Sequence, residues 1–255
     1  MKLTPSNYFT SEANNQFWSV SMFKAFRDCP AAGMAMLRGE YERPTTTALL
    51  QGSYVDAHFS GTLSAFLDAH PEVINKRTGE LKADYQKARA AIARAESDPY
   101  MMECLSGKPQ QILTAEVFGE PWKCKVDFLH EDKIVDLKYM KDMKPIYKDG
   151  EYKPFVIAYG YDIQGFIYQK IVEHVTGKRL PFYLAVITKE DPADIRVIEI
   201  PQEILNGAGG LVQHWIKIFA AIKRGEVEAD RCEQCAYCRS TRKLTGPTSY
   251  YDIFE

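Results

Sequence analysis

The fold is decided by two short stretches, Val126-Asp127-Phe128-Leu129 and, four residues later, Ile134-Val135-Asp136-Leu137-Lys138. Each apolar run has the length of a buried strand, and each carries one carboxylate. Side chains alternate along a strand, so Asp136 and Lys138 share one face while Leu137 points into the core. A hairpin turn through residues 130–133 would bring Asp127 and Asp136 together at one end. Lys138 would then lie beside both carboxylates.

Two carboxylates and a nearby ammonium are the groups that phosphodiester hydrolysis on a bound magnesium ion requires. The carboxylates hold the metal, and the cation orients the attacking water or helps to deprotonate it. A D-x-K sequence also occurs by chance in many soluble chains, where it forms a solvated ion pair. Further elements of the sequence therefore have to decide between the two interpretations.

Two helical segments flank the paired strands. In residues 49–59 the apolar positions repeat with helical spacing and place the imidazole of His58 on the inward face. In residues 161–169, Gln164 and Tyr168 lie four residues apart, on one side of a helix. Taken singly, each of these residues is ordinary, but together they surround the D-x-K stretch in the sequence.

This set of elements resembles the PD-(D/E)XK nuclease superfamily, whose signature is an acidic residue, a gap of about ten residues and then D/E-x-K. A G-x-x-x-x-x-H helix before the signature and a Q-x-x-x-Y helix after it are similar to motifs of the RecB-like branch. In chain order the matching residues are Gly52 to His58, Asp127, Asp136-Leu137-Lys138, and Gln164 with Tyr168. The second residue of the signature is Asp here, where Glu is commoner.

From Phe17 to Leu244 the chain looks like phage and prophage nucleases related to the RecE exonuclease, exodeoxyribonuclease VIII. This resemblance implies an enzyme dependent on Mg²⁺ or Mn²⁺ that degrades linear double-stranded DNA from the 5′ end. Such enzymes act in recombination or repair and leave a 3′ single strand for a single-strand annealing protein. Processive members form rings, so the resemblance also implies a homo-oligomer.

The resemblance also assigns roles to individual residues. It implies that the metal ligands are His58, Asp127, Asp136 and the main-chain carbonyl of Leu137. Lys138 would be the catalytic lysine. Gln164 and Tyr168 would orient the scissile strand or the lysine.

Three cysteines near the end of the chain, Cys232, Cys235 and Cys238, are spaced C-x₂-C-x₂-C, which suits thiolates that share a metal. Cys29 lies in a Cys-Pro turn and is the best candidate for a fourth ligand. RecB-family nucleases join their two chain ends at such positions with a [4Fe-4S] cluster, and the resemblance implies one here. The last gap is shorter than in that family, so Zn²⁺ and a set of reduced thiols without metal both remain alternatives.

Composition agrees with a protein of this type. With 255 residues and 45% hydrophobic content, the chain can bury the core of one α/β domain. We expect one nuclease domain over residues 1–255, with a cysteine-rich segment at 230–244 and a tail at 245–255. The expected fold is a restriction-endonuclease-like core, a central mixed sheet flanked by helices. The absence of a membrane-spanning apolar run and of a signal peptide predicts a cytoplasmic protein.

The patterns predict elements along most of the chain. A three-strand meander is expected at 112–118, 122–129 and 133–139, and later strands at 182–188 and 195–200. Helices are expected at 22–38, interrupted near Cys29-Pro30, and at 81–96 and 210–223. Residues 145–154 are expected to form a loop that could gate the site.

The net charge of −2 implies that DNA would bind to a local basic groove, not to a basic protein surface. Lys138, Lys141, Lys144 and Lys148 could form a track for phosphates, although a solvated face fits these lysines equally well. A second class of function stays open. The chain could be a catalytically weak DNA-binding scaffold of the same fold that docks a recombination partner.

Overall fold

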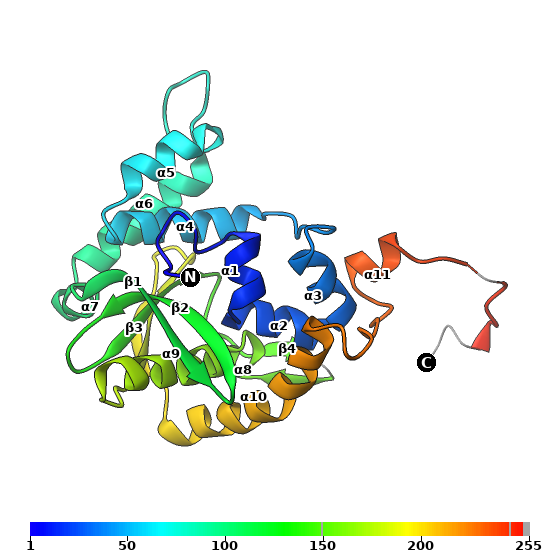
Figure 1. Cartoon of the computed structure of the whole chain (residues 1–255). Coiled ribbons are helices and arrows are strands. Elements are labelled where there is room, and N and C mark those ends of the chain that lie inside the picture. The colour runs from blue at the N-terminus through cyan, green and yellow to red at the C-terminus, as the bar shows by residue number, and fades with distance from the viewer. Residues whose placement is uncertain (149, 245, 252–255) are drawn as a thin grey trace.

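The computed structural model of the chain describes residues 1–148, 150–244 and 246–251 (Figure 1). The helices are α1 (Ser11–Gln16), α2 (Val20–Asp28), α3 (Pro30–Leu37), α4 (Thr47–Phe59), α5 (Leu63–Ala69), the 3₁₀ helix η1 (Pro71–Val73), α6 (Ala83–Glu96), α7 (Pro99–Cys104), α8 (Phe155–Ala158), α9 (Tyr161–Thr176), α10 (Gln202–Lys223) and α11 (Ala236–Ser240). The strands are β1 (Lys108–Val117), β2 (Glu120–Leu129), β3 (Ile134–Met140), β4 (Ile146–Lys148), β5 (Glu151–Lys153), β6 (Phe182–Thr188) and β7 (Ile195–Glu199).

Five strands form one mixed sheet in the order β1-β2-β3-β6-β7. The first three strands are the predicted antiparallel meander, β6 runs parallel to β3, and β7 is antiparallel to β6. A parallel neighbour requires a crossover connection, and the chain makes it through α9. The predicted central mixed sheet flanked by helices is therefore confirmed.

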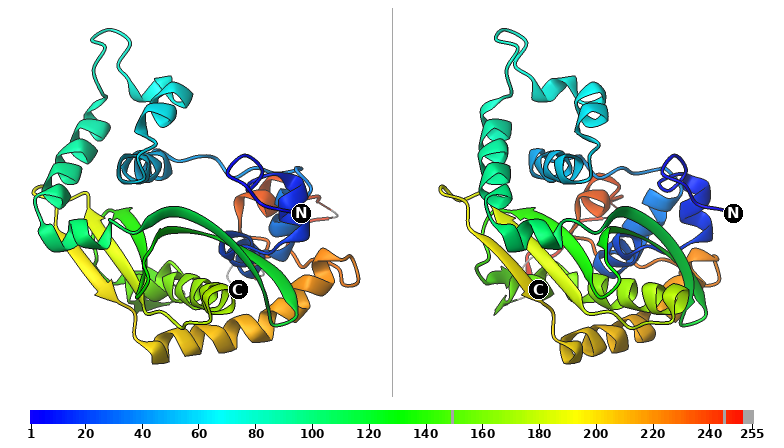
Figure 2. Two further views of the ribbon diagram at one scale, coloured as in Figure 1. Left: turned by 60° about the vertical axis from the view of Figure 1, so that its left-hand side comes forward. Right: turned by 90° about the vertical axis from the view of Figure 1, so that its left-hand side faces the viewer.

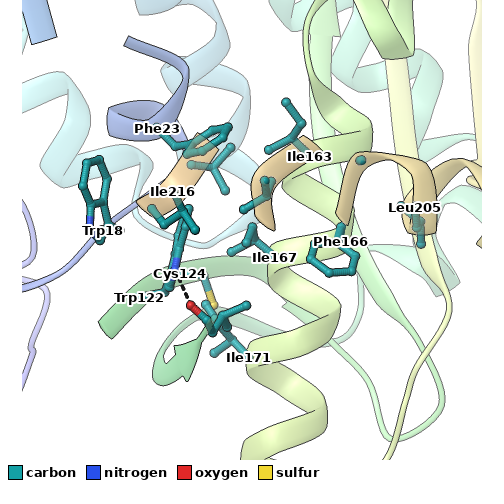
Figure 3. Close-up of a cluster of buried hydrophobic side chains, with 14 of the residues drawn as sticks. Trp18, Phe23, Trp122, Cys124, Ile163, Phe166, Ile167, Ile171, Leu205 and Ile216 are labelled. Atoms are coloured by element: carbon teal, nitrogen blue, oxygen red, sulfur yellow. Dashed lines mark hydrogen bonds between the residues drawn. The ribbon is translucent and has the colours of Figure 1, made fainter. Parts of the chain in front are cut away.

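Both faces of the sheet are covered by helices (Figure 2). Along β6 the alternating side chains divide between two cores. Phe182, Leu184 and Val186 pack in the core that contains α2, α9 and α10, part of which Figure 3 shows. Ala185 and Ile187 face the opposite core, with α4 and α6. A strand buried on both faces is expected to be mostly apolar, and β6 is apolar from Phe182 to Ile187, before Thr188 at its end.

One glycine sets the distance between α9 and the sheet. A Cβ atom at Gly165 would lie 2.6 Å from the ring of Phe182 on β6, so only glycine lets the helix approach this closely. The neighbouring residue on α9 is Gln164, and the close approach brings its side chain within reach of β3. The packing of α9 therefore positions part of the candidate site.

The predicted break at Cys29-Pro30 is confirmed. α2 ends at Asp28, Cys29 is its C-cap and also the N-cap of α3, and Pro30 occupies the first turn of α3. Proline suits that position because the first amides of a helix have no partner within the helix.

Two predictions of local structure differ from the structure. The segment 145–154 was expected to be a loop, but it contains the short hairpin of β4 and β5, in which Tyr147 pairs with Tyr152. Two tyrosines facing each other across a hairpin stabilise it. α10 begins at Gln202, eight residues before the expected start at Gly210. Glycine disfavours helix, but Gly209 is held there by close packing against Phe166.

A segment near each end of the chain is attached to the body of the fold. Trp18 forms a parallel bridge with Trp122 at the edge of β2. The cysteine-rich segment lies against α3, where the amide of Ala31 donates a hydrogen bond to the Asp230 carbonyl at 3.0 Å. Of the tail expected at 245–255, residues 245 and 252–255 lie outside the described residues. Within the described ranges, no helix has the length and apolar character needed to cross a membrane.

Candidate active site and cysteine cluster

The two signature carboxylates lie where β2 and β3 separate. The predicted turn is present, since the amide of His130 donates to the Lys133 carbonyl at 2.9 Å. β2 and β3 then pair only through Leu129 with Ile134 and Phe128 with Val135. The next pair in this register would be Asp127 opposite Asp136. Like charges placed directly opposite each other disfavour strand pairing, so the strands open at the point where the carboxylates meet.

Hydrogen bonds hold both carboxylates in place. The main-chain amide of Leu137 donates to Asp127 Oδ2 at 2.9 Å, and Gln164 Nε2 donates to Asp136 Oδ1 at 2.5 Å. Asp136 is 1% exposed and forms an ion pair with Lys138 two residues later on the same face of β3. Leu137 packs into the opposite core, as the alternation predicted.

The charges of this cluster shift one another's pKa values. Burial, and then the charge of Asp136, raises the pKa of Asp127 well above its usual range. Burial alone would lower the pKa of Lys138, but the charges of Asp136 and Asp127 outweigh it and raise that pKa. The cluster therefore holds the lysine as an ammonium, and its carboxylates repel one another unless a further cation lies between them.

A third carboxylate belongs to the cluster, and sequence reasoning missed it. The charge of Asp56 on α4 raises the pKa of Asp127. Burial, and also the charge of Asp136, raises the pKa of Asp56 itself, although Lys125 and Lys138 oppose this. The charge of Asp56 therefore interacts with those of both signature carboxylates.

His58, the residue on α4 that was expected in this place, interacts elsewhere. Its Nε2 lies 2.8 Å from Glu96 Oε1 on α6, and its side chain is 30% exposed. Successive residues turn by about 100° around a helix, so Asp56 and His58 point in nearly opposite directions. The spacing that could have identified Asp56 is its position four residues after Gly52, on the same side of α4.

Gln110 on β1 holds Asp56 toward the sheet. Its Nε2 donates to Asp56 Oδ1 at 2.9 Å, and its backbone has a φ of 52°, in the left-handed region. The ladder between β1 and β2 pairs Pro109 with Phe128 and Gln111 with Val126, and it omits the pair between them. Gln110 therefore lies opposite the candidate ligand on β2, in a strained conformation of the kind found at functional sites.

Two lysines approach one aromatic ring beside the carboxylates. Lys138 Nζ lies 5.0 Å and Lys24 Nζ lies 5.9 Å from the ring centroid of Tyr161. Lys24 also donates to the Tyr159 carbonyl at 2.5 Å. Burial, and then the charge of Lys138, lowers the pKa of Lys24 to about 8. Lys24 comes from α2, far away in the sequence, so no local pattern marks it as part of this site.

The other residues expected here take varied positions. Tyr168 is half-buried on α9, where burial, and then the charge of Asp136, raises the pKa of its hydroxyl. Lys141, by contrast, has a side chain that is 91% exposed, and Lys148 Nζ lies 3.5 Å from the Ala158 carbonyl. Of the four lysines in the expected phosphate track, Lys138 is therefore the one that contacts the signature carboxylates.

The donor set at this site suits a hard divalent cation. Carboxylate oxygens are the ligands that Mg²⁺ and Mn²⁺ prefer. The register of β2 and β3 brings Asp127 and Asp136 to the same point, and Gln110, the residue opposite Asp127, holds Asp56 toward them. A bound divalent ion would relieve the repulsion that raises the pKa of Asp127. The residues present therefore fit a metal-dependent hydrolytic site.

The structure brings Cys29, Cys232, Cys235 and Cys238 together, and their four sulfur atoms all lie within 4.8 Å of one another. Cys29 and Cys238 are buried, and their sulfur atoms are 3.6 Å apart. Main-chain amides point at the thiols, for example the amide of Cys235 at Cys232 Sγ, at 3.3 Å. Four converging cysteines with amide donors are the arrangement of a metal site. Which ion they hold is a separate question.

Comparison with known proteins agrees with the fold. Residues 19–241 match the model of a family described as a PDDEXK-like domain of unknown function. The chain therefore belongs to this PDDEXK-like family, and its sheet with flanking helices is a restriction-endonuclease-like core. The crystal structure of a candidate exonuclease from Eubacterium rectale is similar, with a TM-score of 0.95 and 43% sequence identity over 99% of this chain and 98% of that one. No curated protein matches the chain.

Proposed function

We propose that this protein is a divalent-metal-dependent deoxyribonuclease that degrades linear double-stranded DNA as an exonuclease. The proposal rests mainly on one observation. Asp127, Asp136 and Lys138 lie together at the point where β2 and β3 separate. The family and the E. rectale protein support a nuclease. The 5′-to-3′ direction, the role in phage-type recombination or repair, and the supply of single strands to an annealing protein are parts of the proposal that rest on the resemblance to RecE.

Each residue of the candidate site would have its own role in hydrolysis. Asp56, Asp127 and Asp136 would hold Mg²⁺ or Mn²⁺, with the Leu137 carbonyl as a further candidate ligand. The metal would supply Lewis-acid polarisation of the phosphate and a more acidic bound water. Lys138, held as an ammonium by Asp136, donates hydrogen bonds to the attacking water or to the phosphate. Gln164 fixes the orientation of Asp136, and Tyr161 and Tyr168 line the same region of α9.

The proposal is tested with DNA substrates of different topology. Purified protein is incubated with linear duplex and with nicked circular duplex of the same sequence, with Mg²⁺ and with EDTA. Degradation of linear DNA alone, and only with Mg²⁺, is expected. Cleavage of the circular substrate would show an endonuclease instead. DNA binding without cleavage of either substrate would favour the alternative, a scaffold of the same fold that docks a recombination partner. Labels at the 5′ or the 3′ end report the direction of degradation.

We expect Lys138→Met to lower the rate of cleavage by about 100-fold or more, because an ammonium next to the reacting phosphate stabilises the charge of the transition state. Metal affinity should change little, since an ammonium does not bind the cation. Single-turnover cleavage measures the first quantity, and Mn²⁺ titration followed by electron paramagnetic resonance measures the second. An equal loss of metal affinity would assign Lys138 to metal binding.

We expect Lys24→Met to weaken DNA binding about tenfold and to reduce the salt dependence by about one phosphate contact. The ammonium groups of Lys24 and Lys138 both approach the ring of Tyr161, and a phosphate bound beside them would neutralise both. Because its pKa is about 8, wild-type affinity should fall as the pH rises from 7 to 9, and the variant should lose this dependence. Lys87→Met, which changes an exposed lysine on α6, is the matched control. Unchanged affinity in Lys24→Met would leave Lys24 a structural role at the end of α8.

Replacing Asp56 and His58 in turn tests which of them binds the metal. We expect Asp56→Asn to weaken Mn²⁺ binding and lower cleavage by about 100-fold, because it removes one hard anionic ligand. His58→Ala should leave cleavage within about threefold, since its partner in the structure is Glu96. Isothermal titration with Mn²⁺ and cleavage rates measure both variants. The reverse result would restore His58 as the ligand.

For the cysteine cluster we propose a single Zn²⁺ ion. A tetrahedral ion with Zn–S bonds of about 2.3 Å places its sulfur ligands about 3.8 Å apart. The separations of 3.6 Å between Cys29 and Cys238 and 3.9 Å between Cys232 and Cys238 are close to this value. In a [4Fe-4S] cluster each cysteine binds a different iron, so the sulfur atoms lie farther apart. Elemental analysis distinguishes the two, and a brown protein with iron and acid-labile sulfide would show the cluster.

A further inference from the structure

The outer face of α10 carries a stripe of large apolar side chains that lie outside the hydrophobic core. Large apolar side chains in a helix that packs on a core normally point inward, and here Leu205, Val212 and Ile216 do so. A second set points outward. Ile204, Leu211, Trp215 and Ile218 are 36–40% exposed. Figures 1 and 2 show α10 at the outside of the molecule with no other element beneath it.

The stripe is symmetric about its centre. Ile204 and Ile218 each lie seven residues from Leu211, so two copies of α10 crossing antiparallel at Leu211 bring the isoleucines of opposite copies together. The same crossing places Trp215 of one copy level with Gly207 of the other, since each lies four residues from the centre. A side chain at Gly207 would meet nothing within 4 Å, so the surface there is open to receive an indole ring.

Charges along one edge of the stripe agree with this arrangement. Glu203 and Lys217 are both exposed and lie on the same side of the helix, toward opposite ends. In the antiparallel crossing, Glu203 of one copy comes near Lys217 of the other, and the contact occurs twice. A surface that is complementary to itself in shape and charge is the property of a two-fold symmetric interface.

We propose that α10 is a self-association face and that its occupant is α10 of a second copy of this chain, packed antiparallel around Leu211. The inference is independent of the proposed nuclease function, because it uses no residue of the candidate active site. A pair of single helix faces buries less than the about 1,200–2,000 Å² of a standard interface, so the dissociation constant should be micromolar. The protein should be monomeric when dilute and dimeric when concentrated.

The test is sedimentation velocity of the full chain from about 1 to 100 μM, a range chosen for an interface of this size. The mass should rise from that of the 29.1 kDa monomer to twice this value. Gly207→Leu should raise the dissociation constant by at least about tenfold, because the leucine occupies the space of the partner's indole ring. The variant should fold normally, since the added side chain meets nothing within its own chain and leucine favours helix over glycine.

Gln213→Leu is the matched control. Gln213 is also exposed, but it lies two residues from Leu211 and therefore about 200° around the helix, on the side away from the stripe. This variant should dimerise like the wild type. Glu203→Lys should weaken the dimer, and the addition of Lys217→Glu in the same chain should restore it. A wild type that stays monomeric over the whole range, or a dimer that Gly207→Leu leaves intact, would overturn the proposal.

Discussion

Asp136→Asn is expected to abolish DNA cleavage, with a loss of at least about 1,000-fold, or about 4 kcal/mol of transition-state stabilisation. Asp136 accepts a hydrogen bond from Gln164 on α9, forms an ion pair with Lys138 and lies opposite Asp127. In the proposed site this one carboxylate would also bind the metal. Asparagine keeps the size and the hydrogen bond to Gln164 but loses the charge. Single-turnover cleavage of linear duplex with Mg²⁺ measures the loss, and a gel shift with Ca²⁺ measures DNA binding, which should persist.

Removing the charge of Asp127 from the same cluster should stabilise the metal-free protein. The pKa of Asp127 is higher in the folded protein than in the unfolded chain. The folded state therefore binds more protons between these two values, and stability falls as the pH rises through that range. At neutral pH, Asp127→Asn should increase the unfolding free energy of the metal-free protein, because the neutral amide removes a buried charge that lies close to Asp136. Urea unfolding with EDTA at pH 7 measures it.

Asp132→Asn is the matched control for both variants, because it is an exposed aspartate in the turn of the same hairpin. It should change neither the cleavage rate nor the stability of the metal-free protein. Normal turnover by Asp136→Asn would contradict the proposed active site. A destabilised Asp127→Asn protein in EDTA would show that the hydrogen bond from the Leu137 amide outweighs the repulsion between the carboxylates.

Cys29→Ala is expected to remove the metal of the cysteine cluster and to lower stability more than other single changes in the chain. A metal at this cluster joins Cys29 to Cys238, 209 residues later. Closing so long a loop restricts the unfolded chain, and a covalent link over a comparable loop is worth about 4–5 kcal/mol. A loss of about 3 kcal/mol would lower the melting temperature by about 6–12 °C. Differential scanning calorimetry and metal analysis of the same samples measure both effects.

Cys104→Ala is the control for this variant. Cys104 is also buried, but it lies in the core with α4 and α6 and outside the cysteine cluster. Its replacement should cost about 1 kcal/mol and leave the metal content unchanged. In Cys29→Ala, limited proteolysis should cut the segment 230–244 first, because the proposed metal would link this segment to Cys29 beside α3. A metal-free wild type that melts at the same temperature as Cys29→Ala would leave these residues as reduced thiols.

The two strands that carry the candidate active site were predictable because the residues that specify them are close together in the sequence. The alternation of Val135, Asp136, Leu137 and Lys138 is sufficient to place the charged pair on one face and the apolar pair on the other. The turn at 130–133 is short enough that the register follows from its length. The cysteine cluster was predictable in the same way for Cys232, Cys235 and Cys238, whose spacing alone brings the thiols together, while Cys29 was assigned from a family resemblance.

The remaining parts of the site depend on contacts that no local pattern encodes. Which side of α4 faces the carboxylates depends on how that helix packs against the sheet. The apolar spacing indicated His58, yet the structure turns Asp56 toward the site and pairs His58 with Glu96 on α6. Lys24 reaches the site from α2, and Gln110 does so because β1 leaves the regular strand conformation at one residue.

The sequence by itself determined the strand pair, the position of its charges, the break at Cys29-Pro30 and the order of the motifs. Each of these depends on neighbouring residues and on the two-residue period of a strand or the steric limits of proline. Only the tertiary structure decided which residue of α4 joins the carboxylates, which lysine lies beside Lys138, and which face of α10 remains uncovered. These outcomes depend on how helices pack against the sheet across long sequence separations, where several packings satisfy the same hydrophobic pattern and the fit of side chains such as Phe182 against Gly165 selects one.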